Sequence, residues 1–244
     1  MPRTLPEPVV GDPRVFYLWD DFTDTIVTAD RWTTLVADVA DGGATAIKTN
    51  DAAGGIVQLA VQDATDNDEV GLESPRENWL FANNKPLLFE ARVQFTEANT
   101  DDANIFVGLC NAPGANLMID DGGAVVASLS GLGFYKIDGG TRWQVISSVA
   151  TTRNTTDLSA TNANNLSKLA QTAGGASYAT LRAHFQPYSS TNAYVDFFID
   201  GVHCAKHDFV YTSATEMAIA FGVKNGGANA ETMLVDYVYC GQYR

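Results

Sequence analysis

The sequence has few basic residues and no long apolar run. Of its 244 residues, 15 are Lys or Arg and 29 are Asp or Glu, which gives a formal net charge of -14 at pH 7. A molecule with this charge repels phosphate backbones and anionic lipid surfaces. No stretch reaches the roughly 18 apolar residues that a membrane-spanning helix needs. We therefore expect neither nucleic acid nor a membrane as a direct partner.

Cysteine is also scarce. Cys110, Cys204 and Cys240 stand alone without paired spacing, which argues against a disulfide framework and against a cysteine-type zinc site. The first residues run into prolines and lack the apolar core of a signal peptide. These features predict a protein that is assembled in a reducing cytoplasm.

Helical periodicity is nearly absent, whereas short strand signals recur with Gly- and Asn-rich turns between them. Asp200-Gly201 is typical of a two-residue hairpin turn. The expected strands are Val15–Trp19, Thr33–Ala37, Ala44–Thr49, Ile56–Ala60, Val70–Glu73, Leu87–Phe95, Ile105–Cys110, Gly133–Ile137, Arg142–Val149, Tyr178–Phe185, Ala193–Ile199, Val202–Phe209, Met217–Val223 and Met233–Cys240. The last of these is almost wholly apolar, so we place it in the centre of a sheet. The pattern predicts an all-β, two-sheet antiparallel sandwich over residues 15–244.

Three segments do not fit the strand pattern. Residues 1–14 hold half of the eight prolines and predict an extended arm. Asn111–Gly131 and Thr151–Ser177 are long and polar, and loops of this length in a domain are usually functional or mobile. We expect both loops to be contact surfaces.

Acidic residues offer few catalytic arrangements. Asp196 and Asp200 are four residues apart, with Asp200 in a turn, so they do not form the close carboxyl pair that retaining glycoside hydrolysis needs. Glu90 lies inside an apolar strand, where a buried acid with a raised pKa would mark a catalytic site. An ion pair with Arg92 on the same strand face is the favoured interpretation.

Metal ligation also receives little support. His203 and His207 flank Cys204 in one strand, and regular alternation places both histidines on one face with the cysteine opposite, so the three do not converge. The acidic stretches Asp63–Glu69 and Asp101–Asn104 supply hard oxygen ligands of the kind calcium prefers, but without EF-hand spacing.

Several motifs occur in an order that resembles the concanavalin A-like lectin/glucanase jelly roll. They are Asp20-Asp21-Phe22 with Arg31-Trp32, then Phe89-Glu90-Ala91-Arg92-Val93, Phe198-Ile199-Asp200-Gly201, and Val235-Asp236-Tyr237-Val238. The resemblance implies that the closing strand pairs near the first one. It also implies that Asp236 is a candidate calcium ligand. The enzymes of this superfamily carry a Glu-x-Asp-x-Glu strand that this sequence lacks, so we expect no enzymatic activity and no catalytic residues.

The same resemblance extends to non-catalytic bacteriophage jelly rolls. It implies a virion structural protein, in first place a homotrimeric capsid decoration or cement protein on the exterior of the capsid, assembled in the host cytoplasm. The arm and the two loops would then bind the major capsid protein and stabilise the capsid. The alternative is a lectin-like module of a phage fibre or spike that binds surface carbohydrate. Its aromatic candidates are Trp32, Trp79, Trp143, Tyr135 and Tyr194, although an aromatic residue on a sandwich strand more often belongs to the core. A glycan-cleaving enzyme ranks third.

Overall fold

The computed structural model describes residues 11–23, 31–37, 43–48, 54–62, 65–96, 102–111, 113–120, 122–158, 177–212 and 215–244. All regular structure in these ranges is β. The strands are β1 (Val15–Asp20), β2 (Thr33–Ala37), β3 (Ala44–Lys48), β4 (Val57–Val61), β5 (Glu69–Glu73), β6 (Trp79–Leu80), β7 (Leu87–Thr96), β8 (Ala103–Cys110), β9 (Gly131–Lys136), β10 (Gln144–Val149), β11 (Thr152–Asp157), β12 (Ala179–Pro187), β13 (Asn192–Ile199), β14 (Val202–Val210), β15 (Glu216–Asn225) and β16 (Glu231–Tyr243). No helix that is long and apolar enough to span a membrane occurs in these residues.

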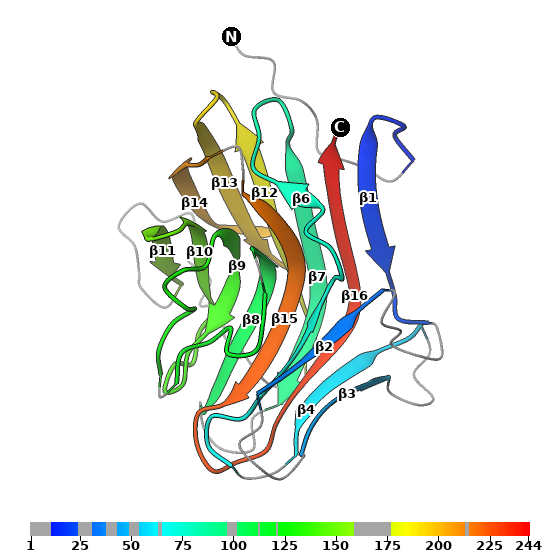
Figure 1. Cartoon of the computed structure of the whole chain (residues 1–244), viewed down its shortest axis with the longest axis vertical. Helices are drawn as coiled ribbons and strands as arrows, with labels where there is room; N and C mark the ends of the chain where they lie inside the picture. Colours follow the sequence, from blue (N-terminus) through cyan, green and yellow to red (C-terminus); the bar gives the residue numbers. More distant parts are fainter. Residues whose placement is uncertain are drawn as a thin grey trace.

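The strands form two packed antiparallel sheets (Figure 1). Sheet A has the order β14-β13-β12-β7-β16-β4-β3, and β1 adds to it by pairing with β16. Sheet B has the order β11-β10-β9-β8-β15-β5-β2, and β6 pairs with β15. The predicted two-sheet antiparallel sandwich is confirmed.

The closing strand lies in the interior of sheet A, as its apolar sequence predicted. β16 pairs with β7 on one side and, along successive parts of its length, with β4 and β1 on the other. The implied pairing of the last strand with the first is confirmed by the register Val15↔Tyr243 to Asp20↔Val238. Two strands were not predicted. β6 has only two residues, and β11 is polar (TRNTTD), since it is an edge strand with only one neighbour in its sheet.

Apolar side chains from both sheets fill the space between them. Large aromatic rings contribute much of this core, and Phe134 of sheet B meets Phe197 of sheet A edge to face, with ring centroids 5.5 Å apart. Trp32, Trp79 and Trp143 are all buried. Their role is therefore packing, as is usual for aromatic residues on sandwich strands, and they are not available as lectin-type platforms.

The Asp-Asp-Phe motif at the end of β1 has a structural explanation. Phe22 has a left-handed backbone with φ of 52°, and its N–H donates to Asp20 Oδ1 at 2.8 Å. Trp32 Nε1 donates to Asp20 Oδ2, also at 2.8 Å. The Trp32 ring then packs against Phe22 and Phe221. The Asp20 carboxylate thus bonds both to the chain reversal after β1 and to a core tryptophan, and so fixes the position of the reversal.

A second apolar cluster lies on the outer face of sheet B. Residues 113–120 and 122–130, which we name the covering segment, bury Leu117, Met118, Val125 and Leu129 against the sheet. The stretch Asn111–Gly131 was expected to be a polar contact surface, but these four side chains serve the fold instead. Contact of its exposed side with a partner stays a prediction.

Part of the remaining predictions lies outside the described residues. This applies to residues 1–10 of the arm and to 159–176 of the second loop. Of the described part of that loop, Thr152–Asp157 is the edge strand β11. The three cysteines are free and buried.

Candidate functional site

The outer face of sheet A carries a set of aromatic and charged side chains that face solvent. Strand pairing aligns them across the sheet, since Trp19 lies opposite Tyr239, Tyr239 opposite Glu90, and Glu90 opposite Arg182. Cross-strand neighbours on one face are close enough to interact. We name this surface the aromatic–ionic face. Its members are Tyr17, Trp19, Glu90, Arg92, Arg182, Asp236, Tyr237 and Tyr239.

The aromatic half of this face lies on β1 and β16. Trp19 is 50% exposed and Tyr17 is 42% exposed, which is unusual for rings of this size on a sandwich. Trp19 stacks on Tyr237 with ring centroids 5.1 Å apart and an interplanar angle of 19°. The centre of the Tyr239 ring lies 6.4 Å from the centre of the Trp19 ring and 6.4 Å from that of the Tyr17 ring. Trp19 and Tyr17 are therefore the accessible rings of an apolar platform, and the partly buried Tyr237 and the buried Tyr239 support them from the sheet.

The ionic half is tightly paired. Arg182 Nε donates to Glu90 Oε2 at 2.6 Å, and the Tyr237 hydroxyl donates to Glu90 Oε1 at 2.8 Å. Burial, followed by this bond to Glu90, raises the pKa of Tyr237 to about 12, so the phenol keeps its proton. The predicted Glu90–Arg92 pair is wrong, because Arg92 pairs with Asp236 instead.

A β-bulge explains that exchange of partners. The register of β16 against β7 shifts between Val235 and Tyr237, which leaves Asp236 without an opposite residue. Asp236 Oδ2 accepts from the Arg92 guanidinium, which also lies 4.3 Å from the centre of the Tyr178 ring. Within the described residues no group of three or more His, Cys, Asp or Glu side chains has metal-binding geometry. A calcium ion at Asp236 would compete with Arg92, and this site stays a prediction.

The two histidines of β14 face opposite sides, so their predicted common face is wrong. The register against β13 shifts between Phe197 and Phe198, and this bulge inverts the alternation along β14. His203 Nε2 lies 2.8 Å from Asp196 Oδ1 on the outer face. His207 is buried toward sheet B, where burial lowers its pKa to about 4.

The aspartates of the β13–β14 hairpin have structural roles. Asp196 accepts from Gln186 Nε2 at 3.0 Å in addition to its contact with His203. Asp200 has a φ of 49° in the predicted turn, and its Oδ1 accepts from Thr180 N at 2.8 Å. Neither arrangement provides a free carboxyl pair.

Of the five aromatic candidates for a lectin-like site, Tyr194 is among the exposed large side chains, and its role in binding stays a prediction. Tyr194 is partly exposed, with Tyr188 beside it and Lys206 over its ring at 3.9 Å. Tyr135 is buried under the covering segment. Trp19 and Tyr237 were missed, although the spacing of Tyr17 and Trp19 already puts both on one side of β1.

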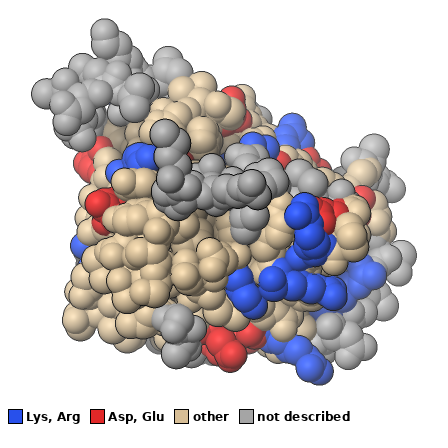
Figure 2. Space-filling model, turned by 90° about the horizontal axis from the view of Figure 1, so that it is seen from above, with Lys and Arg blue, Asp and Glu red and all other residues tan. Residues whose placement is uncertain are grey.

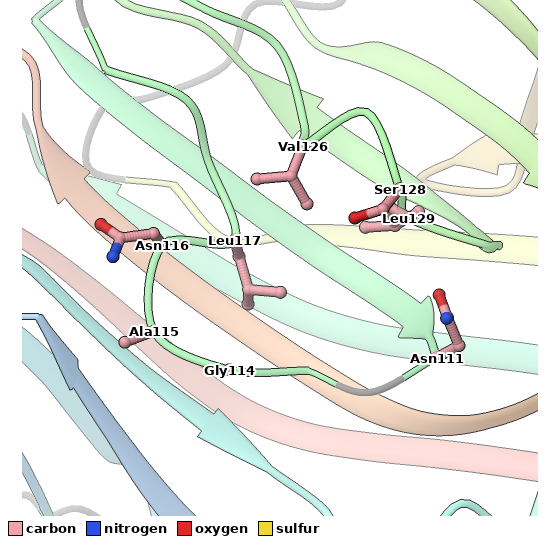
Figure 3. A pocket seen from close by; sticks show the side chains of 8 residues that line it. All are labelled: Asn111, Gly114, Ala115, Asn116, Leu117, Val126, Ser128 and Leu129. Atoms are coloured by element: carbon pink, nitrogen blue, oxygen red, sulfur yellow. The ribbon is translucent and has the colours of Figure 1, made fainter. Parts of the chain in front are cut away.

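A cavity of about 280 Å³ lies between the two limbs of the covering segment, over sheet B (Figure 3). Its lining residues are Asn111, Gly114, Ala115, Asn116, Leu117, Val126, Ser128 and Leu129. Asn111 Oδ1 accepts from Ser130 N at 2.6 Å, and Asn116 Oδ1 accepts from Lys224 Nζ at 3.2 Å. Both amide oxygens therefore hold the covering segment in place.

Beneath the covering segment lies a buried ion pair. Lys224 is fully buried, and its Nζ contacts Glu69 Oε2 at 3.9 Å, the Met118 carbonyl at 3.3 Å and the Asp120 carboxylate. Burial raises the pKa of Glu69 to about 7, as in many general acids. However, Glu69 Oε1 accepts from Leu117 N at 2.9 Å and its side chain is closed off from solvent. Glu69 therefore fastens the covering segment to sheet B.

The comparisons with known proteins concern structure alone, because no protein family and no curated protein matches the sequence. An endo-1,3-beta-glucanase from Streptomyces sioyaensis superposes with a TM-score of 0.60 at 14% identity, covering 98% of this chain and 99% of that one. The Emp47p carbohydrate recognition domain gives a TM-score of 0.56 at 14% identity, covering 90% and 92%. The chain has a concanavalin A-like lectin/glucanase fold.

A third structure with this fold is the endo-beta-1,4-glucuronan lyase from the fungus Trichoderma reesei, with a TM-score of 0.53 at 9% identity, covering 86% of this chain and 95% of that one. The similar structures thus include a carbohydrate recognition domain and enzymes. At these identities the likeness establishes the fold and leaves the activity open. The phage virion type has no counterpart among these three structures and stays a prediction.

Proposed function

We propose that this chain is a carbohydrate-binding module that holds a glycan on the aromatic–ionic face without cleaving it. The observation that carries the proposal is the half-exposed Trp19, stacked on Tyr237 beside a row of paired charges. The apolar C–H faces of a sugar ring stack on such a platform, while its hydroxyl groups bond to neighbouring charged groups. The similarity to a carbohydrate recognition domain and to a glucanase supports the same class of ligand.

The carboxylates of this face are placed for binding rather than hydrolysis. Both oxygens of Glu90 accept hydrogen bonds, from Arg182 and from Tyr237. Asp236 is paired with Arg92. Retaining hydrolysis requires one carboxyl as acid and a second as nucleophile, about 5 Å apart. Since each carboxylate already has a cationic partner, we infer that neither takes these roles.

Substitution of Trp19 by alanine tests the proposal. We expect the parent protein to be retarded in native gels that contain a bound polysaccharide, from a panel of laminarin, lichenan, xylan, alginate and glucuronan. Trp19→Ala should weaken that retardation at least tenfold, or about 1.4 kcal/mol, because the exposed ring is the centre of the platform. Tyr188→Ala is the matched control, because Tyr188 is an exposed ring that contacts Tyr194 and is not one of the eight residues of the aromatic–ionic face.

Three outcomes of these measurements would contradict the proposal in different ways. Equal retardation of Trp19→Ala and the parent would reject this face as the binding surface. Retardation by no polysaccharide would reject the carbohydrate proposal altogether. Release of reducing ends that survives repurification and is lost in Glu90→Gln would show a hydrolase instead.

Capsid decoration remains the second candidate. The exposed rings of Tyr17 and Trp19 lie shortly after the arm in the sequence and would suit burial against a neighbouring subunit. Light scattering separates the two functions, because the decoration hypothesis expects a stable trimer and a free carbohydrate module is expected to be a monomer. The capsid partner, the virion location and the host cytoplasm stay predictions.

A further inference from the structure

The buried lysine near the end of β15 lies beside an amide and two carboxyl groups. Figure 2 shows Lys and Arg side chains on the surface, where these residues are normally found. Lys224, in contrast, is fully buried. Its Nζ donates to Asn116 Oδ1 at 3.2 Å, lies 3.9 Å from Glu69 Oε2 and pairs with the Asp120 carboxylate. An amine, a carboxamide and a proton acceptor therefore meet at one point beneath the covering segment.

Strand pairing and the covering segment bring these groups together. Lys224 of β15 lies opposite Glu69 of β5, so both side chains are on the outer face of sheet B. Asn116 and Asp120 belong to the covering segment, which packs on that face. Contact between Lys224 and Asn116 joins two residues that are 108 positions apart in the sequence. Holding two reactive groups side by side in this way replaces a collision in solution by a reaction within one molecule.

Glu69 is placed to accept a proton from Lys224. Its side chain is closed off from solvent, and Oε1 accepts from Leu117 N at 2.9 Å, whereas the buried Oε2 has no hydrogen-bond partner among the described residues. Burial raises the pKa of Glu69 to about 7, so this carboxylate takes up a proton more readily than an exposed glutamate does. A small rotation of the side chain would bring Oε2 into hydrogen-bond distance of Nζ. Glu69 can then remove a proton from Lys224 at neutral pH.

We propose that Lys224 and Asn116 form an intramolecular isopeptide bond and that Glu69 transfers the protons. The neutral Nζ attacks Cγ of Asn116, so that the Nζ–Cγ bond forms and the Cγ–Nδ2 bond breaks. Two of the three protons of the Lys224 ammonium group pass through Glu69 to Nδ2, which leaves as an ammonium ion. Glu69 ends as the carboxylate that it was at the start. The reaction needs no other reactant, and it fastens the covering segment covalently to β15.

Asp120 is the other group that Lys224 could attack, and the chemistry favours Asn116. The carbon of a carboxylate anion repels the lone pair of an amine, whereas the carbon of a neutral amide does not. Attack on Asp120 would also release water, and the surrounding water favours the reverse reaction because the Asp120 side chain is 58% exposed. Attack on Asn116 releases ammonium, which diffuses away. Asp120 therefore holds the Lys224 amine next to the amide and does not itself react.

The bond changes the stability of the chain in a measurable way. It closes a loop of 108 positions, and a crosslink across a long loop removes conformational freedom from the unfolded chain. We expect the linked protein to melt at a higher temperature than the unlinked protein and to migrate faster in a denaturing gel. The structure describes the chain before this reaction, so denaturation of protein that still has its full mass measures the ion pair alone.

Mass spectrometry of the purified full chain tests the proposal. We expect the intact chain to weigh less than its sequence by one ammonia molecule. After denaturation and digestion with trypsin, the peptide Val93–Lys136 should be joined to His207–Arg244, because trypsin does not cleave after an acylated lysine at position 224. Spectra of the fragments would place the link between Lys224 and Asn116.

Glu69→Gln is the decisive variant, because its amide can still accept from Leu117 N and the fold should persist. It should form the bond about a hundredfold more slowly, since glutamine does not take up the proton. Asn116→Ala should keep the full mass. Lys206→Gln changes an exposed lysine on another strand and should form the bond like the parent. The melting temperature of each variant shows whether it is folded.

The outcomes separate the proposal from its alternatives. A parent chain that keeps its full mass after prolonged incubation overturns the proposal. Loss of ammonia without a joined peptide overturns it too, because an asparagine that forms a cyclic imide loses the same mass. Loss of water with Lys224 joined to Asp120 would contradict Asn116 as the acceptor, and equal rates in Glu69→Gln and the parent would contradict the role of Glu69. None of these measurements involves Trp19, so they are independent of the proposed glycan surface.

Discussion

Replacement of Lys224 by methionine is expected to lower the free energy of unfolding by about 3–5 kcal/mol at pH 8, because it leaves a buried charge without its partner. Lys224 is fully buried and contacts Glu69, Asp120 and the amide oxygen of Asn116. Methionine fills a similar volume but cannot donate to these oxygens. Urea denaturation followed by tryptophan fluorescence would measure the loss.

The pH dependence of that loss identifies its cause. Glu69 has a pKa of about 7 in the folded protein against an ordinary 4.5, so the folded state binds this proton more tightly than the unfolded chain. The contribution of Glu69 to stability is therefore fully present below pH 4.5 and is lost as the pH rises to 7. Without the Lys224 charge the pKa rises further. We expect Lys224→Met to cost less at pH 5, where Glu69 is protonated, than at pH 8.

Two further variants serve as controls. The double variant Lys224→Met, Glu69→Gln should recover part of the lost stability at pH 8, since no buried charge remains at Glu69. Lys206→Met removes an exposed lysine that lies over the Tyr194 ring and should cost no more than about 1 kcal/mol. An equal loss for Lys224→Met at pH 5 and pH 8 would mean that Glu69 and Lys224 are not coupled.

Replacement of Asp20 by alanine is expected to cost about 3 kcal/mol, from the loss of two hydrogen bonds to a charged acceptor. The change leaves the buried Trp32 Nε1 without its acceptor and releases the left-handed backbone at Phe22. Asp20→Asn keeps one carbonyl oxygen and should lose about half as much. Chemical denaturation at pH 7 gives both values.

Asp21→Ala is the matched control for this prediction. Asp21 is the next residue along the chain, and its carboxylate accepts from the exposed Thr23 hydroxyl at 2.9 Å. The expected loss is about 0.5 kcal/mol or less. Similar losses for Asp20→Ala and Asp21→Ala would contradict the role assigned to the Asp20 carboxylate.

The strands could be predicted from sequence because alternation and turn residues are local signals. The sequence did not predict correctly which side chains lie next to one another on neighbouring strands. A bulge at Asp236 gives Arg92 a different partner from the one expected, and a bulge between β13 and β14 separates His203 from His207. Each bulge inserts one residue and inverts every later side chain. Local sequence patterns do not mark such insertions.

The exposed platform was missed for a related reason. The residue type does not distinguish the exposed Trp19 from the other three tryptophans, which are buried. Only the pairing of β1 with β16 places Trp19 beside Tyr237 and Tyr239. That pairing joins residues more than two hundred positions apart, so no window along the chain contains both halves of the surface.

The interior position of β16 has a consequence for synthesis of the chain on the ribosome. β16 supplies the shared partner of β7, β4 and β1, yet it comprises residues 231–243 and is translated after all three of them. Until it emerges, those three strands have unpaired backbone groups along their edges, which invite pairing with other chains. Sheet A therefore closes only after residues 231–243 have left the ribosome, and a nascent chain that stalls before residue 231 lacks the strand that joins its first and middle parts.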